Sequence, residues 1–269
     1  MAAVAGSDGT VGKALEVLDL VASFGRPVRF SEILEQSPYP KATTYRLIQT
    51  LTSQRMLAFD TERQTYAPGV RLVRLAHSAW TQSSLAPIAR PFIDALSLEV
   101  RDTVHLAQLD HAQVLYVDKR NAREPVQMFS QAGKVGPAYC TGVGKAMLAY
   151  LPESELAPIL SQQSYHRFTP STLASEEALR AELGNIRARG FAFDREEHEP
   201  GIICVALPIL TESSRVLGAL SVTTTTTRKS LDDLAALAPV IAETARRIAG
   251  EASSWRFPDT AAQTTRTGT

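Results

Sequence analysis

The chain is poor in several residue types and patterns, and each shortage excludes a class of protein. Its 269 residues include only Cys140 and Cys204, too few and too far apart for a disulfide framework or a zinc ribbon. Lysine plus arginine equals aspartate plus glutamate at 28 each, which argues against non-specific coating of nucleic acid or of an anionic membrane. No segment approaches the roughly 20 apolar residues that span a bilayer, and the first residues lack the pattern of a secretory signal. We therefore expect a cytoplasmic protein with reduced thiols and no membrane partner.

Length and composition predict two domains. A chain of 269 residues with 44% hydrophobic residues exceeds the usual size of one domain and can bury a sizeable core. We place a first domain over residues 11–68, a linker helix over 69–84 and a second domain over 85–252. Residues 1–10 and 257–269 are mostly small and polar, so we expect these tails to be flexible.

The segment that follows Ser37 joins a tight turn to a helix with different chemistry on its two faces. Thr44, Leu47, Ile48 and Leu51 recur at i, i+3, i+4 and i+7, which is the spacing of one buried stripe. The other face carries mostly donors that bind phosphates and base edges. Its residues are Lys41, Ala42, Thr43, Tyr45, Arg46 and Gln49. This arrangement is typical of a recognition helix that enters the major groove of double-stranded DNA.

The flanking segments complete a winged helix-turn-helix domain. Apolar periodicity predicts helices over residues 13–24 and 30–34, before the recognition helix. Residues 56–60 and 65–67 can pair as strands around a polar tip that carries Arg63, which would form the wing and a further DNA contact. A lone amphipathic helix with exposed basic residues is more often simply solvated, so the prediction depends on these neighbours. Because basic residues barely outnumber acidic ones here, any basic footprint must be local.

The rest of the chain predicts a linker helix and a mixed domain. The linker helix has a broad apolar face, which can pack within one chain or against a second copy. A dimer is attractive because helix-turn-helix domains usually bind paired half-sites roughly 34 Å apart. The alternation of strands and helices beyond it indicates one sheet with helices packed against it. We expect helices over residues 87–100, 144–150, 152–161, 175–189 and 231–249, and strands over 103–109, 114–118, 191–196, 202–209 and 216–223.

Five ordered motifs resemble those of one protein family. They are PKATTYRLI from Pro40, TGVGKA from Thr141, RGFAFDREE from Arg189, GIICVALP from Gly201 and GALSV from Gly218. The chain resembles the IclR-type bacterial transcriptional regulators over nearly its whole length. The resemblance implies an α+β architecture, in which a winged helix-turn-helix is joined by a linker helix to a GAF-like α/β effector-binding domain. The chain departs from the family pattern at Pro38, Ala42 and Cys140, where the family usually has Gly, usually has Ser and often has His.

The resemblance also implies a small-molecule cavity in the second domain. Its residues would be Gly142, Val143, Asp194, Ile202, Cys204, Ser221 and Thr223. Strand periodicity agrees for two pairs, because residues two apart share a face of a strand. Gly142 and Gly144 either present free N–H groups to an anion or allow close packing, and both readings stay open. Asp194 would repel an acid unless it is neutral or meets a ligand hydroxyl, so a hydroxylated or oxo acid fits best.

These observations predict a transcriptional regulator that binds operator DNA as a dimer or dimer of dimers and responds to a small organic or aromatic acid. One alternative is an enzyme with Cys140 or Cys204 as nucleophile and a histidine as base. The candidate bases are His105, His111, His166 and His198. Another alternative is a second domain that only oligomerises. We expect no metal, because no two histidines have ligand spacing, and no cofactor, because neither a P-loop nor a dinucleotide fingerprint occurs.

Overall fold

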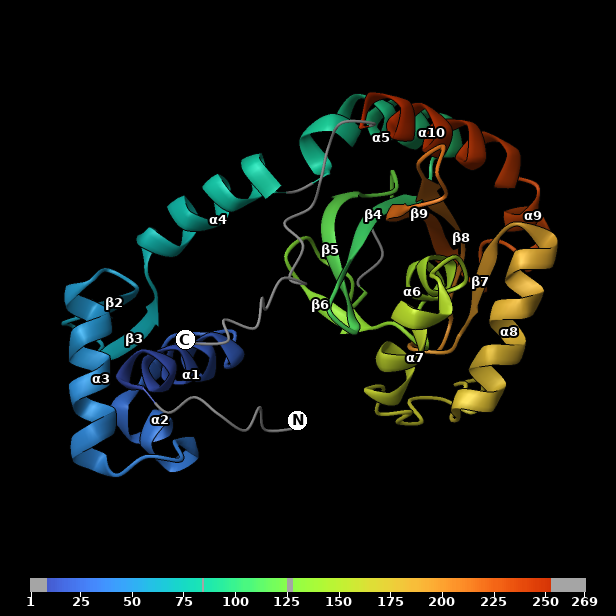
Figure 1. Ribbon diagram of the computed structural model, residues 1–269. Helices are drawn as coiled ribbons and strands as arrows, with labels where there is room; N and C mark the ends of the chain where they lie inside the picture. Colours follow the sequence, from blue (N-terminus) through green and yellow to red (C-terminus); the bar gives the residue numbers. More distant parts are fainter. Residues whose placement is uncertain (1–8, 84, 125–127, 253–269) are drawn as a thin grey trace, which may run out of the picture. The chain divides into compact units, whose positions relative to one another are not determined.

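The computed structural model describes residues 9–83, 85–124 and 128–252, which fall into two compact units, Met1–Ala79 and Trp80–Thr269 (Figure 1). The tail predicted over residues 257–269 and nearly all of the tail over 1–10 lie outside the described residues. No helix within those described ranges is long and apolar enough to cross a lipid bilayer.

The N-terminal unit is a winged helix-turn-helix, as predicted. Its helices are α1 (Thr10–Ser23), α2 (Phe30–Gln36) and α3 (Lys41–Ser53), and its strands are β1 (Val28–Arg29), β2 (Leu57–Asp60) and β3 (Thr65–Pro68). The strands form an antiparallel sheet of order β1-β3-β2, in which β2 and β3 make the wing. The prediction missed β1, because two residues are too few to show the alternation of a strand. A single apolar cluster that includes Val21, Ile33 and Ile48 holds the helices to the sheet.

The linker helix α4 (Val70–Ser83) follows the wing. Leu72 packs against the core of the N-terminal unit, while Val70, Val73 and Leu75 are exposed at 65%, 68% and 50%. Trp80, which belongs to the C-terminal unit, donates its indole N–H to the carbonyl of Val117 at 3.1 Å. Val70, Val73 and Leu75 therefore give α4 an exposed apolar set of side chains.

The C-terminal unit is built on a curled antiparallel sheet of six strands, in the order β6-β5-β4-β9-β8-β7 (Figure 1). The strands are β4 (Thr103–Asp110), β5 (Gln113–Arg120), β6 (Val135–Pro137), β7 (Ala192–Arg195), β8 (Ile202–Leu210) and β9 (Val216–Thr225). The helices are α5 (Ala86–Val100), α6 (Gly142–Leu148), α7 (Glu153–Ser161), α8 (Glu176–Arg189), α9 (Leu231–Ala235) and α10 (Ala238–Glu251). The short strand β6 was not predicted.

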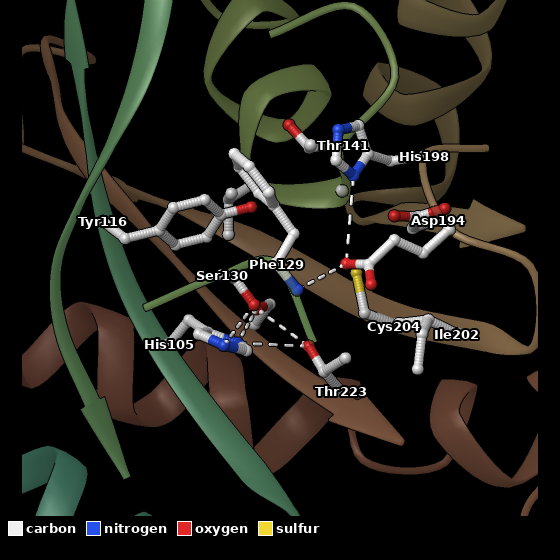
Figure 2. A pocket seen from close by; sticks show the side chains of 14 residues that line it. His105, Tyr116, Phe129, Ser130, Thr141, Asp194, His198, Ile202, Cys204 and Thr223 are labelled. Carbon is white, nitrogen blue, oxygen red and sulfur yellow. Dashed lines mark hydrogen bonds and ion pairs between the residues drawn. The ribbon is translucent and has the colours of Figure 1, made fainter. Parts of the chain in front are cut away.

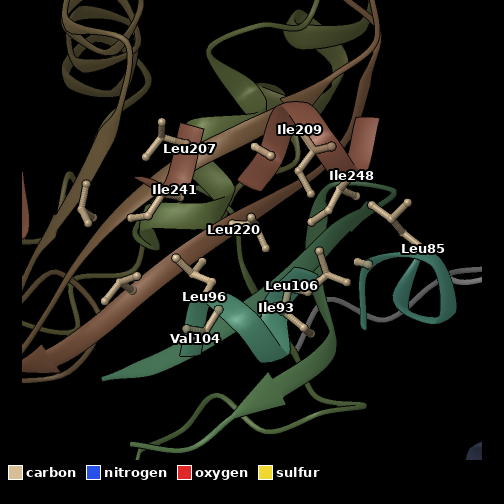
Figure 3. Close-up of a cluster of buried hydrophobic side chains, with 14 of the residues drawn as sticks. Leu85, Ile93, Leu96, Val104, Leu106, Leu207, Ile209, Leu220, Ile241 and Ile248 are labelled. Carbon is tan, nitrogen blue, oxygen red and sulfur yellow. The ribbon is translucent and has the colours of Figure 1, made fainter. Parts of the chain in front are cut away.

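Alternation along the strands divides the core of the C-terminal unit into two layers. On β8, Val205 and Leu207 join the cluster under α5 and α10, while Cys204 and Ala206 join the cluster around α6. Figure 3 shows the first cluster, in which Ile241 of α10 lies over the sheet. In the second layer α6 covers the centre of the sheet, where it contacts β8 and β9. The candidate site described below lies in this layer.

The prediction of a single helix over residues 231–249 was wrong, because the helix is interrupted between Ala235 and Ala238. The chain forms α9 and α10 instead, and α10 starts with a proline, Pro239, in its first turn. Proline has no N–H to donate to the preceding turn and is favoured at a helix start, so the helix is interrupted before it. Apolar periodicity continues across the break, and for that reason the pattern resembled one helix.

Candidate DNA-reading helix and effector cavity

Helix α3 divides its two faces as predicted. Thr44, Leu47, Ile48 and Leu51 are buried. On the opposite face Lys41, Ala42, Tyr45, Arg46 and Gln49 are exposed and Thr43 is half-buried. Arg46 forms no ion pair with any residue that the structure describes, so its guanidinium is available to a phosphate or a guanine.

The turn before α3 is held by a hydroxyl network centred on Thr44. The Thr44 hydroxyl donates to the Tyr39 carbonyl at 3.1 Å and lies 2.9 Å from the Ser37 hydroxyl. The Ser37 hydroxyl in turn accepts the Tyr39 N–H at 3.2 Å. These bonds fix the angle between the turn and α3, although Pro38 occupies the turn.

The wing tip carries Arg63 on a tight turn. Asp60 accepts the backbone N–H groups of Glu62 and Arg63 at 2.9 and 3.0 Å, and Gln64 has a positive φ of 55°. Arg63 is exposed at the tip. Tyr45 differs from its neighbours on α3, because its ring also packs edge-on against Phe30 at 5.7 Å. We therefore expect Tyr45 to support α2 as well as to face DNA.

The structure brings all seven predicted cavity residues together, around one small cavity between α6 and the sheet (Figure 2). Sequence reasoning missed seven further residues that line it: His105, Tyr116, Phe129, Ser130, Thr141, His198 and Glu199. Strand register could have found one, because His105 pairs directly with Ser221 across β4 and β9. The free volume of the cavity is about 30 Å³, enough for one or a few water molecules. We therefore expect a ligand of several heavy atoms to move side chains of the wall.

The floor of the cavity is a neutral hydrogen-bonding network around His105. Its Nε2 lies 2.8 Å from the Ser130 hydroxyl, and its Nδ1 lies 3.2 Å from the Thr223 hydroxyl and 3.4 Å from that of Ser221 (Figure 2). Burial, helped by the positive charge of Lys119, lowers the pKa of His105 to about 3. A neutral imidazole among hydroxyls can both donate and accept, so this floor suits a ligand hydroxyl or carbonyl.

The wall opposite carries a buried acidic group. Asp194 is 7% exposed and pairs with Cys204 across β7 and β8. Its Oδ1 accepts the backbone N–H of Glu197 at 2.8 Å. Burial first, and then the charge of Glu197, raises the pKa of Asp194 to about 7. Near neutral pH this carboxyl is therefore close to half protonated.

Aromatic rings close one side of the cavity. Phe129 packs against His198 at a tilt of 58°, with 4.9 Å between ring centroids, and His198 packs against Phe168 at a tilt of 51°, with 4.7 Å between centroids. The outermost ring, Phe168, is 44% exposed. The row of rings thus runs from the cavity toward solvent. Its inner members are held in place because the Phe129 N–H donates to Glu199 at 2.8 Å.

Close packing accounts for the glycines at the start of α6. A Cβ on Gly142 would lie 2.3 Å from the sulfur of Cys204, and one on Gly144 would lie 2.3 Å from the carbonyl oxygen of Ala138. Larger side chains would push α6 away from the sheet. The close-packing interpretation of these glycines is therefore the one that the geometry favours.

The cysteines lie in surroundings that suppress thiolate chemistry. Cys140 and Cys204 are both buried, and burial raises the pKa of each thiol well above its ordinary range. Two of the four candidate bases lie elsewhere: His111 is on the exposed turn beside Asp110, and His166 packs on Phe168. Within the described part of the chain, no group of three His, Cys, Asp or Glu residues could hold a metal ion.

Comparisons with known proteins agree with both units. Residues 77–250 match the family described as bacterial transcriptional regulator IclR C-terminal, and residues 10–61 match the IclR helix-turn-helix domain. The HTH-type transcriptional regulator XynR of Escherichia coli is 33% identical over 226 residues, which cover 84% of this chain and 90% of XynR. The crystal structure of Thermotoga maritima IclR covers 90% of this chain and 98% of its own, with 28% identity and a TM-score of 0.73. An IclR homologue of Microbacterium hydrocarbonoxydans in complex with 4-hydroxybenzoate has the same fold, with a TM-score of 0.76 at 21% identity, over 91% of this chain and all of that chain.

Proposed function

The chain belongs to the IclR family of bacterial transcriptional regulators, and on that premise we propose which of its residues read DNA and which bind the effector. As a member of this family it is a DNA-binding regulator with an effector-binding C-terminal domain. The observation that carries the assignment is the gathering of residues from α6, β7, β8 and β9 around one cavity. Effector binding there would change the operator affinity of the N-terminal unit, provided that the effector binds two states of the protein unequally.

Lys41, Thr43, Arg46 and Gln49 are the proposed contacts of α3 with operator DNA, with Ala42 and Tyr45 on the same face. Their exposure, and the absence of an ion pair for Arg46 among the described residues, support this role. Arg63 at the wing tip is proposed to contact the backbone, since exposed arginines on wings suit phosphates.

The effector is proposed to be a small hydroxylated or oxo acid. The neutral floor of His105, Ser221 and Thr223 supports recognition of a hydroxyl or carbonyl oxygen. Gly142, Val143, Ile202 and Cys204 complete the cavity with small or apolar surface. The complex of the Microbacterium homologue with 4-hydroxybenzoate, a hydroxylated acid, is in keeping with this class.

The active form is proposed to be a homodimer or a dimer of dimers in the bacterial cytoplasm. The apolar side chains that α4 exposes, Val70, Val73 and Leu75, support self-association, because a second copy would cover them. Paired recognition helices would then meet successive half-sites of the operator.

The two alternatives are less well supported. A cysteine enzyme needs a thiolate, and the burial of both cysteines disfavours that form. A C-terminal unit that only oligomerises does not account for a cavity lined by hydroxyls, a neutral imidazole and a carboxyl.

The DNA half of the proposal is tested by selecting duplexes from a random pool with the full-length protein and measuring affinity for the selected site. Arg46→Ala should weaken binding about 5-fold to 150-fold, because one arginine contact is worth about 1–3 kcal/mol. Arg74→Ala, which removes the same charge from the exposed surface of α4, is the matched control. Equal affinities of the parent and Arg46→Ala would remove Arg46 from the interface.

The effector half is tested by thermal unfolding against a panel of hydroxy, oxo and aromatic acids. A ligand at 100 times its Kd adds about 2.7 kcal/mol, which is a shift of roughly 5–11 °C for a unit of this size. Ser221→Ala should reduce the shift and leave the affinity for the selected DNA unchanged. A shift that is the same in Ser221→Ala would place the ligand elsewhere.

A further inference from the structure

The cavity contains no positively charged lysine or arginine side chain. Apart from a thiol and a phenol that burial keeps neutral, the ionisable groups on its wall are two carboxyls, Asp194 and Glu199, and two histidines. Glu199 is already engaged, since it accepts the Phe129 N–H at 2.8 Å and lies 3.9 Å from Nδ1 of His198. An acidic ligand therefore has no fixed cation to meet, and Asp194 is the carboxyl left to face it.

Two lysines beside the cavity, Lys145 and Lys119, lie outside its lining. Lys145 is fully buried and pairs with Glu197. Lys119 does not line the cavity: its ammonium donates to the carbonyl of Ser130 at 2.9 Å, and its charge acts on Glu199 and His105. A carboxylate in the cavity therefore meets no ammonium of the lining, and the charge of Lys119 is already balanced against Glu199.

Two buried carboxyls share the single ammonium of Lys145. Glu197 Oε1 bonds Lys145, its Oε2 is buried without a hydrogen-bond partner among the described residues, and its backbone N–H bonds Asp194 Oδ1 at 2.8 Å. If Asp194 and Glu197 were both ionised, one buried negative charge would be uncompensated, which is strongly unfavourable in a protein interior. A proton on Asp194 restores the balance. Since Oδ1 accepts an N–H, the proton belongs on Oδ2.

We infer that the cavity takes up an organic acid as its anion together with one proton from solvent, which Asp194 holds on Oδ2 and donates to the ligand carboxylate. The inference deepens the proposed function and rests on it. Asp194 is thus the residue that selects an acid over other ligands, and the Asp194 hydroxyl replaces the lysine or arginine that a carboxylate site usually contains. No covalent bond changes apart from the protonation of Asp194.

Several elements around Asp194 contribute titratable groups. The segment after β7 contributes Glu197, His198 and Glu199, and α6 with the residues before it contributes Lys145 and Cys140. Strand β8 contributes Cys204, and strand β5 contributes Tyr116. Burial holds both thiols and the phenol in their neutral forms. His198 needs a control, because a histidinium in the wall would also attract an acid.

The raised pKa of Asp194, about 7, sets the size of the effect. The free site is mostly protonated at about pH 6 and mostly ionised at about pH 8, so the Kd for an acid should rise about tenfold between them. The corresponding amide carries no charge and has no need of the proton, so its Kd should stay constant. An acid and its amide therefore diverge as the pH rises.

The test is isothermal titration of the full-length protein with 4-hydroxybenzoate, lactate and pyruvate, each beside its amide. At about pH 8, titrations in buffers of different ionisation enthalpy should give an uptake close to one proton per acid bound. This count uses the unaltered protein and needs no variant to fold. Asp194→Asn should remove both the proton uptake and the tenfold pH dependence, because the asparagine N–H₂ donates at every pH. His198→Gln should keep both.

Three results would overturn the inference. Acid binding without proton uptake would do so and leave the proposed function standing. A pH dependence that survives in Asp194→Asn and disappears in His198→Gln would transfer the effect to the histidine. Binding of the amides, but of none of the acids at either pH, would overturn the acid effector of the proposed function as well.

Discussion

Replacing Lys145 by methionine should destabilise the C-terminal unit by about 3–5 kcal/mol, the usual cost of removing one partner of a buried ion pair. Lys145 is fully buried and Glu197 is 3% exposed, so solvent screens the pair very little. Methionine keeps the length and apolar stem of lysine, so the loss is mainly electrostatic. It leaves the carboxylate of Glu197 buried without a counter-ion.

The same geometry predicts the outcome of the double variant. Lys145→Met with Glu197→Gln removes both charges, and most of the loss should be recovered, because neutral replacements of a buried pair are often tolerated. Urea denaturation of the single and double variants measures the cycle. In a thermal scan the single variant should unfold roughly 6–20 °C below the parent. Arg246→Met, which breaks the exposed pair with Glu243, is the matched control and should change the midpoint little.

A cost of less than about 1 kcal/mol for Lys145→Met, the value of an exposed pair, would refute the description of this ion pair as desolvated. So would a double variant no more stable than Lys145→Met alone, because the loss would then come from packing and not from the unpaired carboxylate.

Three further predictions concern other parts of the chain. Gly144→Ala should destabilise the C-terminal unit by about 1–3 kcal/mol, because its Cβ would lie 2.3 Å from the Ala138 carbonyl oxygen. Gly184→Ala on the open surface of α8 should instead stabilise this unit by about 0.5–1 kcal/mol. Denaturation midpoints of the two variants that shift in the same direction would contradict the close packing of Gly144. In the folded protein the pKa of Asp194 is raised to about 7, so the stability that its protonated form provides is complete below its unfolded pKa and is lost as the pH rises through 7. Asp194→Asn should therefore stabilise the protein relative to the parent at about pH 8 and much less at about pH 4. A stability difference independent of pH would argue against burial of this carboxyl. Thr44→Val should destabilise the N-terminal unit by about 1–2 kcal/mol, because the hydrogen bonds to Tyr39 and Ser37 are lost inside the turn. Equal unfolding curves of parent and variant, followed in the N-terminal unit, would show that this hydroxyl network contributes nothing to stability.

The N-terminal unit could be predicted almost completely, because its signals are local. The buried stripe of α3 follows from a spacing of three and four residues, and the wing follows from two short strands around a polar tip. The two-residue strand β1 could not be predicted, since it exists only through its pairing with β3. Pro239 was the local signal for the break between α9 and α10, but the apolar periodicity continues across the break and predicted one helix.

The cavity was harder to predict, because most of its contacts join distant segments. The seven expected residues do meet around one cavity, and their role in binding stays a prediction. His105 could have been added from the pairing of β4 with β9, but Phe129 and Ser130 lie on an irregular segment without periodicity. The burial of Lys145 could not be predicted either. A lysine is almost never fully buried unless paired, and its partner Glu197 lies 52 residues away.

The small size of the empty cavity has a consequence for sensitivity. With about 30 Å³ free, we expect a larger ligand to move side chains of the wall such as the ring pair of Phe129 and His198, and the free energy of that movement would be subtracted from its affinity. Binding of such a ligand would then be coupled to a change in the shape of the cavity. That coupling would lower the affinity and so favour a ligand that is present at high concentration.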